Sequence, residues 1–267
     1  MARKRRQLWM AASQTTRFGE VKFGGFRAHF SPEKQQQFAA CAFRIAPQTG
    51  VIAFRGTDAT LVGWKEDLNL SFESPVPAQQ DAAKFLGDML ALYSHAYVVG
   101  HSKGGNLALY AAARCNPALQ GRILQVLNFD GPGFTGEMMT QPGYLSIVPR
   151  ICTYLPEFSV FGLLLEREES FRVIKSRQIG LLQHDPYYWE VLGPDFVPGK
   201  ELTQDSRFLD RTFKNWLAGM SRAERNEFVD AVFDLLMVEE NSFIAVLMTD
   251  GQVVKNKLFR LSEAVSA

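Results

Sequence analysis

The chain has 267 residues, of which 46% are hydrophobic and 21% are charged, and 29 Lys and Arg residues nearly balance 28 Asp and Glu residues. This composition is typical of one folded domain with a substantial core and excludes a disordered chain. The formal net charge of +1 provides no overall field that would attract nucleic acid. The three cysteines, Cys41, Cys115 and Cys152, are widely spaced in apolar stretches, so we expect reduced thiols and no zinc site.

The first residues are basic, with Arg3 to Arg6 in a row, but they lack the long apolar stretch and the cleavage site of a secretory signal. The most apolar later stretch, residues 158–165, is too short to span a bilayer. We therefore expect a soluble, cytoplasmic protein. A basic run of this kind also permits contact with an acidic membrane surface, although a solvated terminus is the commoner case.

Strands and helices alternate along most of the chain. Residues 79–93 carry apolar side chains at helical spacing, between runs that are β-branched and apolar. The predicted strands cover residues 38–45, 50–55, 96–99, 123–129, 151–155 and 171–175, and the first two form a hairpin around a turn at Pro47 to Gly50. This order predicts an α/β fold, a doubly wound and mostly parallel sheet with an antiparallel start and helices on both faces.

The stretch from Gly100 to Gly104, Gly-His-Ser-Lys-Gly, lies between the strand at 96–99 and a helical run at 106–114. A serine on a sharp strand-to-helix turn needs small residues two positions to either side, and both glycines meet that need. The stretch therefore predicts a nucleophile elbow with Ser102 at the carboxyl edge of the sheet, where such sheets place their chemistry. This is the pattern of a serine hydrolase.

A serine nucleophile needs a base, and in this fold the histidine follows the nucleophile in the chain. His29 and His95 precede Ser102, and His101 lies inside the elbow, where we expect packing or a bond to the backbone. Only His184 follows Ser102. His184 is therefore the predicted base.

The residue that orients the base is less narrowly defined by the sequence. Asp130 follows the strand at 123–129 in an Asp-Gly-Pro-Gly loop, and Glu157 follows the next strand. We favour Asp130, because a short side chain suits a close carboxylate–imidazole bond, and keep Glu157 as the alternative. Asp185 is adjacent to His184 and is poorly placed to orient it.

An oxyanion that forms during attack on a carbonyl needs hydrogen-bond donors already in place. The backbone N–H of Lys103, the residue after the nucleophile, is one predicted donor, and Thr57 in the loop after an earlier strand is the other. No residue pattern implies a metal ion or an organic cofactor.

The last part of the chain differs in pattern. Residues 206–217 and 221–237 are predicted amphipathic helices, and a capping box at Ser221 to Glu224 opens the second. We therefore divide the chain into a hydrolase core, residues 1–200, and a helical appendage packed on it, residues 201–267. Residues 134–150 fit either a lid over the site or a packed crossover helix.

Several of these motifs resemble those of a known group. Phe54-Arg55-Gly56-Thr57, the stretch Trp64 to Leu68 and Gly-His-Ser-Lys-Gly-Gly at 100–105 are similar to the two signatures of class 3 lipases. Together with Asn-Phe-Asp-Gly-Pro-Gly-Phe at 128–134 and Gln-His-Asp at 183–185, they resemble more closely a bacterial α/β-hydrolase family of unknown function. The resemblance implies a triad of Ser102, Asp130 and His184 that acts on an acyl ester.

Two features depart from the class 3 lipase pattern. Those lipases usually carry leucine where this chain has Lys103, and a lysine beside the acyl pocket argues against a purely hydrophobic substrate. They also usually have a helical segment before the first strands, whereas only a short stub precedes Phe18 here.

The sequence thus predicts a serine esterase or lipase-like hydrolase that forms an acyl-enzyme on a small-molecule ester or a lipid. An acyltransferase or a thioesterase would use the same three residues. The alternative that is not an enzyme is a binding protein that has the same fold but catalyses no reaction.

Overall fold

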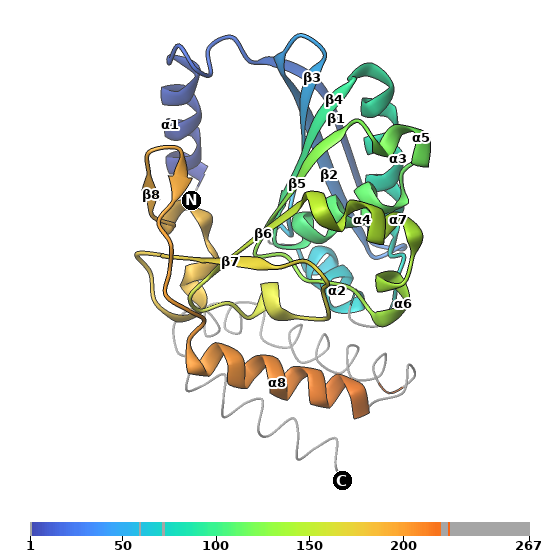
Figure 1. Ribbon diagram of the computed structural model, residues 1–267, viewed down its shortest axis with the longest axis vertical. Coiled ribbons are helices and arrows are strands. Elements are labelled where there is room, and N and C mark those ends of the chain that lie inside the picture. Colours follow the sequence, from blue (N-terminus) through green and yellow to red (C-terminus); the bar gives the residue numbers. More distant parts are fainter. Residues whose placement is uncertain (1, 59, 71–72, 220–223, 225–267) are drawn as a thin grey trace.

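The computed structural model describes residues 2–58, 60–70, 73–219 and 224, and its centre is a seven-stranded sheet (Figure 1). The strands lie side by side in chain order; the first three pair antiparallel and each later pair is parallel. They are β1 (Lys22–Ser31), β2 (Gln36–Ala46), β3 (Thr49–Phe54), β4 (His95–His101), β5 (Ile123–Phe129), β6 (Ile151–Pro156) and β7 (Phe171–Ile174), and β8 (Val191–Leu192) and β9 (Asp195–Phe196) form a separate hairpin. The predicted α/β fold, a mostly parallel sheet with an antiparallel start, is confirmed. The strands follow one another in chain order, so the sheet is wound in one direction and is not doubly wound as predicted.

The helices cover the two faces unequally. Because the strands follow one another in one direction, right-handed crossovers bring their helices to the same face. The described helices are α1 (Ala2–Ser13), α2 (Leu61–Asn69), α3 (Pro77–Leu92), α4 (Lys103–Arg114), α5 (Pro117–Gln120), α6 (Gly136–Met139), α7 (Pro142–Ile147) and α8 (Gln204–Gly219), with short 3-10 helices at Val148–Arg150, Phe161–Leu163, Gly180–His184 and Pro186–Tyr188. Figure 1 shows α3, α4 and α7 on one side of the sheet, and α1 and the β8–β9 hairpin on the other.

The hydrophobic core lies between the sheet and the pair α3 and α4. Half of the 12 residues of helix α4 are alanine or glycine, so it packs closely against both α3 and strands β3, β4 and β5. Met138, Met139, Tyr144 and Ile147 of the following crossover are buried in the same core. Residues 134–150 are therefore a packed crossover, as one of the two sequence interpretations has it, and not a lid.

The N-terminal elements differ most from the prediction. The stub before the first strands is a helix, α1, and the edge strand β1 precedes the predicted hairpin. Strand β1 carries two adjacent glycines and a bulge between Phe23 and Gly25, which interrupts the alternation that marks a strand. The antiparallel pairing of β1 with β2 depends on contacts between the two strands, which the local sequence of β1 does not reveal.

The C-terminal part is described only to the end of α8, which covers the predicted helix at 206–217. The second predicted helix, 221–237, lies outside the described residues apart from residue 224, and the division of the chain at residue 200 stays a prediction. Within the described residues, no helix is both long enough and apolar enough to cross a membrane. The thiols of Cys41, Cys115 and Cys152 are not joined in disulfides.

Candidate active site

Ser102 stands at the turn between β4 and α4 with a strained backbone, at φ 57° and ψ −132°. Non-glycine residues rarely adopt such angles, and they persist where the surrounding structure holds them. A side chain on Gly100 would place its Cβ 1.9 Å from the carbonyl oxygen of Gly104, and one on Gly104 would come within 2.3 Å of the carbonyl oxygen of Phe54. The turn therefore requires both glycines that the sequence motif supplies.

Asp130 and His184 lie in direct contact although 54 residues separate them in the chain. The Nδ1 of His184 is 2.6 Å from Oδ2 of Asp130, and the Asp130 side chain is fully buried. The hydroxyl of Ser159 donates a hydrogen bond to the other carboxylate oxygen at 2.5 Å. Each oxygen of Asp130 thus has a partner, which fixes the orientation of the carboxylate toward the imidazole.

The loop that carries Asp130 is held by its neighbours. Asp130 follows β5 with φ 50°, and the Asn128 side chain accepts from the N–H of Gly131 at 3.0 Å and donates to the Gly131 carbonyl at 3.2 Å. These bonds close a tight turn directly after the strand. The sharp turn directs the carboxylate toward His184 instead of toward solvent.

His184 is also attached to the elbow itself. The Nε2–H of His101 donates to the carbonyl oxygen of His184 at 2.7 Å, and the two imidazole rings lie 4.5 Å apart between centroids. Phe161 packs against the His184 ring at the same centroid distance. The role predicted for His101, a bond to the backbone, is therefore confirmed, and it places His184 beside the residue that precedes Ser102.

Glu157, the alternative acid, lies elsewhere. Its Oε1 accepts from the N–H of Lys200 at 3.2 Å, and its carbonyl accepts from the N–H of Thr203 at 2.8 Å. These contacts anchor the segment that leads into α8. The structure brings Asp130, and not Glu157, to His184.

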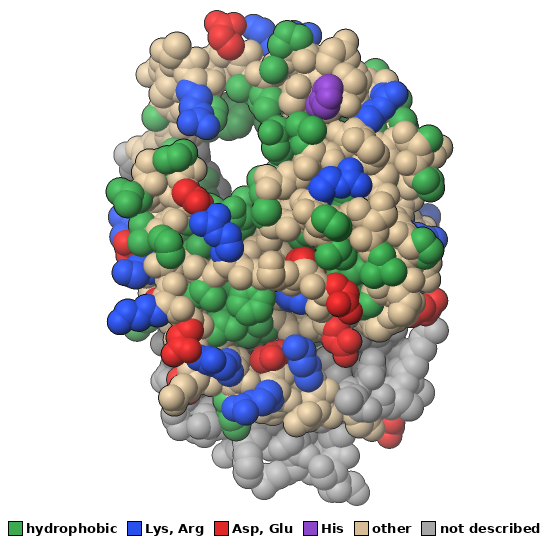
Figure 2. All heavy atoms as spheres, viewed as in Figure 1, with side chains coloured by type: hydrophobic (Ala, Val, Ile, Leu, Met, Phe, Trp, Pro, Cys, Tyr) green, Lys and Arg blue, Asp and Glu red, His purple; other side chains and the backbone are tan. Residues whose placement is uncertain are grey.

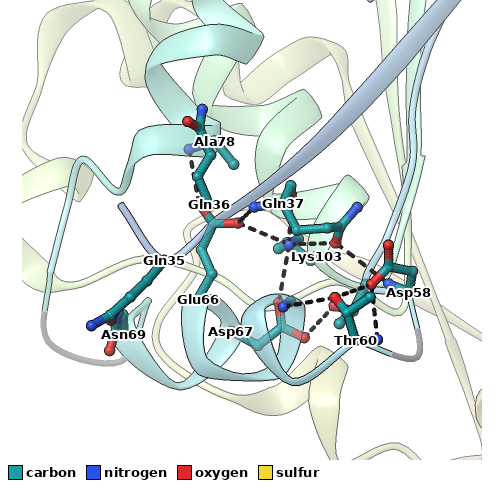
Figure 3. A network of polar contacts seen from close by, with 12 residues as sticks. Gln35, Gln36, Gln37, Asp58, Thr60, Glu66, Asp67, Asn69, Ala78 and Lys103 are labelled. Carbon is teal, nitrogen blue, oxygen red and sulfur yellow. Dashed lines mark hydrogen bonds and ion pairs between the residues drawn. The ribbon is translucent and has the colours of Figure 1, made fainter. Parts of the chain in front are cut away.

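The side chain of Lys103 does not lie beside a pocket. It is completely buried, and its Nζ donates to the carbonyl oxygen of Gln37 at 2.9 Å, to Oε1 of Gln37 at 2.8 Å and to Oε2 of Glu66 at 3.0 Å (Figure 3). Glu66 is buried as well and accepts from the backbone N–H groups of Gln37 and Ala78. The expectation of a lysine beside the acyl pocket is therefore wrong: its charge is neutralised in a network that joins the elbow to β2 and α2.

The same network reaches the other predicted oxyanion residue. The hydroxyl of Thr57 donates to Asp67, which follows Glu66 in α2, and Nζ of Lys103 is 3.8 Å from Asp67 Oδ1. Burial raises the pKa of Asp67 to about 6, an effect opposed by the charge of Lys103 and the hydrogen bond from Thr57. Thr60 is the N-cap of helix α2, and its hydroxyl accepts a hydrogen bond from the N–H of Gly63 in the first turn. This cap sets where the helix begins and therefore the direction of the Glu66 and Asp67 side chains.

Four residues of this arrangement were not singled out from the sequence. Glu66 and Asp67 fall inside the stretch Trp64 to Leu68, whose spacing resembles class 3 lipases, but nothing local assigns them a partner. Gln37 and Ser159 have no sequence signal, because their partners Lys103 and Asp130 are 66 and 29 residues away. Only the folded chain brings them to the site.

Comparison with known proteins identifies the family. The chain matches the sequence model of the Mbeg1-like family over residues 12–234, and it therefore belongs to that family. The finer resemblance to a bacterial family of unknown function stays a prediction. No curated protein shows significant sequence similarity to the chain.

Several solved structures are similar over much of the chain. A fungal lipase–inhibitor complex is 16% identical with a TM-score of 0.44, over 64% of this chain and 74% of that one. M37 lipase is 14% identical with a TM-score of 0.45, over 80% and 72% of the two chains. Rhizomucor miehei triacylglyceride lipase is 15% identical with a TM-score of 0.42, over 65% and 74%. Similarities at this level assign no activity, so function is argued from the site.

Proposed function

We propose that the chain is a serine hydrolase that cleaves carboxylic esters. The observation that carries the proposal is the 2.6 Å contact between buried Asp130 and His184, held against a strained elbow that presents Ser102. A serine hydrolase needs this set of groups: a nucleophile, a base, and a carboxylate that fixes the tautomer of the base.

In the proposed reaction, the Nδ1–H of His184 donates to Asp130, which leaves Nε2 free to take the proton of Ser102. The serine oxygen attacks the ester carbonyl, and the resulting oxyanion accepts from the backbone N–H groups of Lys103 and Thr57. We assign the backbone N–H of Thr57 to this role, because its hydroxyl proton is already donated to Asp67. His184 then protonates the departing alcohol, and water activated by the same imidazole releases the acid from the acyl-enzyme.

We further propose an acyl chain as the acid part of the ester. The ammonium of Lys103 is engaged by Gln37 and Glu66, so it does not bring charge to an acyl group on Ser102. Phe161, which packs on the His184 ring, adds an apolar wall beside the base. Both features favour a hydrophobic substrate.

A fluorophosphonate probe tests the nucleophile, because it reacts only with an activated serine. The wild-type protein should be labelled and Ser102→Ala should not; a wild type that stays unlabelled would contradict the proposal. A chain-length series of nitrophenyl esters then tests the substrate class. Faster turnover of acetyl esters than of longer acyl esters would refute the acyl-lipid assignment.

Two carboxamide variants test the acid. Asp130→Asn should lower kcat by about 10⁴-fold, because the amide favours the wrong tautomer of the base. Glu157→Gln is the matched control and should retain most activity, since Glu157 binds the Lys200 backbone and not the imidazole. The reverse result would transfer the role to Glu157.

A further inference from the structure

Positive charge is concentrated in the first part of the chain. Residues 1–31 contain seven Lys and Arg residues against one acidic residue, Glu20, which gives this segment a formal charge of +6. The whole chain carries only +1, so the remaining residues are net acidic. Four of the basic residues, Arg3, Lys4, Arg5 and Arg6, belong to the start of α1.

The same segment exposes large hydrophobic side chains. Seven of them have half or more of their surface exposed, and they are Leu8, Trp9, Met10, Phe18, Phe23, Phe26 and Phe30. Single exposed hydrophobic residues are ordinary, whereas a contiguous group of them marks a contact surface. The orientation of β1 decides whether these side chains share one face.

Contacts of β1 define which way its side chains point. Arg27 and His29 bond to Asp88 and Asp81 of α3, so they lie on the face of the sheet that α3 covers. Side chains alternate along a strand, so Phe26 and Phe30 lie on the opposite face.

Three further aromatic residues join this face. Phe23 packs against Phe43 of β2 at 5.9 Å between ring centroids, and Trp9 of α1 packs against the same ring at 5.7 Å. We call Trp9, Phe23, Phe26, Phe30 and Phe43 the aromatic face. Figure 2 shows an opening between α1 and the sheet, with hydrophobic side chains at its rim.

We propose that the aromatic face and helix α1 dock on an anionic lipid membrane. Tryptophan and phenylalanine insert their rings at the boundary between headgroups and acyl chains, and clustered Lys and Arg residues are attracted to anionic headgroups. A second copy of the chain is a poor occupant, because a twofold contact would bring two segments of charge +6 together. The charge and the exposed rings both fit a membrane.

The aromatic face extends to the edge of the sheet that carries the candidate active site. Strands β1 and β3 both run antiparallel to β2, so they point the same way. Phe30 therefore lies at the end of the sheet where β3 leads into Thr57. Docking would bring this edge near the lipid surface, and it does not depend on the proposed hydrolase activity.

Vesicle flotation tests the docking. The full chain should float with phosphatidylcholine vesicles that contain phosphatidylserine, should bind pure phosphatidylcholine vesicles much less, and should dissociate as salt is raised. The Phe26→Ser, Phe30→Ser double variant should bind about tenfold more weakly, because two inserted rings are lost. The Arg5→Glu, Arg6→Glu variant should lose at least about 25-fold, at roughly fivefold for each of the two positive charges removed.

The control is Leu92→Ser with Leu145→Ser, because these side chains are 63% and 52% exposed, close to the 64% and 55% of Phe26 and Phe30, but lie on α3 and α7 on the other side of the sheet. It should bind vesicles as the wild type does. Circular dichroism of each variant checks folding, and exposed positions should leave it unchanged.

No binding to phosphatidylserine vesicles, or an equal loss in the Leu92 and Leu145 control, would overturn the proposal. Concentration-dependent dimerisation that the Phe26 and Phe30 substitutions abolish would assign the face to self-association instead, and binding to a single-stranded oligonucleotide in place of vesicles would assign it to nucleic acid. These measurements need no turnover, so their failure is distinguishable from failure of the proposed function.

Discussion

Replacing Lys103 with methionine tests the buried network most directly. Methionine keeps most of the volume of the side chain but removes the ammonium that bonds to Gln37 and Glu66. The backbone N–H of residue 103 remains, so the variant removes only the side-chain anchor of the elbow.

The expected cost follows from the contacts that are lost. Removing one partner of a buried ion pair typically costs about 3 to 5 kcal/mol, because the other charge is left uncompensated. The Gln37 carbonyl loses its donor, at roughly 1 to 3 kcal/mol, whereas Glu66 keeps two backbone N–H donors that reduce its penalty. We therefore expect a loss of about 4 kcal/mol in the free energy of unfolding. For a chain of this size that lowers the Tm by about 10 °C.

Urea denaturation at neutral pH measures this loss, and a double-mutant cycle identifies its cause. Lys103→Met combined with Glu66→Gln removes both charges and should be about 2 kcal/mol more stable than Lys103→Met alone. Tyr144→Phe is the control, because it deletes a hydroxyl that donates to Glu169 at 2.7 Å and accepts from the N–H of Glu168 at 3.4 Å, and neither partner belongs to the Lys103 network. The reasoning is refuted if Lys103→Met costs no more than Tyr144→Phe, or if the effects of the two charge substitutions simply add.

Three further predictions concern the same site. As pH rises from about 4 to about 6, the wild type should lose about 2 kcal/mol in the free energy of unfolding relative to Asp67→Asn. The reason is that burial raises the pKa of Asp67 in the folded state to about 6, so unfolding in this pH range releases a proton. Parallel urea curves at each pH measure the difference in stability between the two proteins, and a difference that does not change with pH would contradict the prediction. Gly104→Ala should cost about 2 kcal/mol or more and slow fluorophosphonate labelling, since its Cβ would lie 2.3 Å from the Phe54 carbonyl oxygen; labelling at the wild-type rate would show that the elbow tolerates a side chain. Ser159→Ala should lower kcat about tenfold with little change in KM, because Asp130 loses a hydrogen bond that orients it; an unchanged kcat in steady-state assays would remove Ser159 from the site.

Local patterns were enough for much of the fold. The strands from β2 to β7 and helices α3 and α4 follow from runs of β-branched residues, helical spacing and turn residues, with ends shifted by at most three residues. The elements that were missed include α1, α2 and β1, which have weak local patterns, and the short α5, β8 and β9. Their pairing and packing partners decide their structure.

The sequence by itself determined the elbow at Ser102, because its requirement for small neighbours is a steric rule that acts within five residues. It also narrowed the candidates for the base to His184, by chain order alone. The tertiary structure brings Asp130, and not Glu157, against His184, and it places the ammonium of Lys103 in the buried network with Glu66. The physical reason is the range of the interactions: backbone strain is encoded by adjacent residues, whereas the partner of a buried charge is set by whichever distant segment the packing of the sheet brings against it.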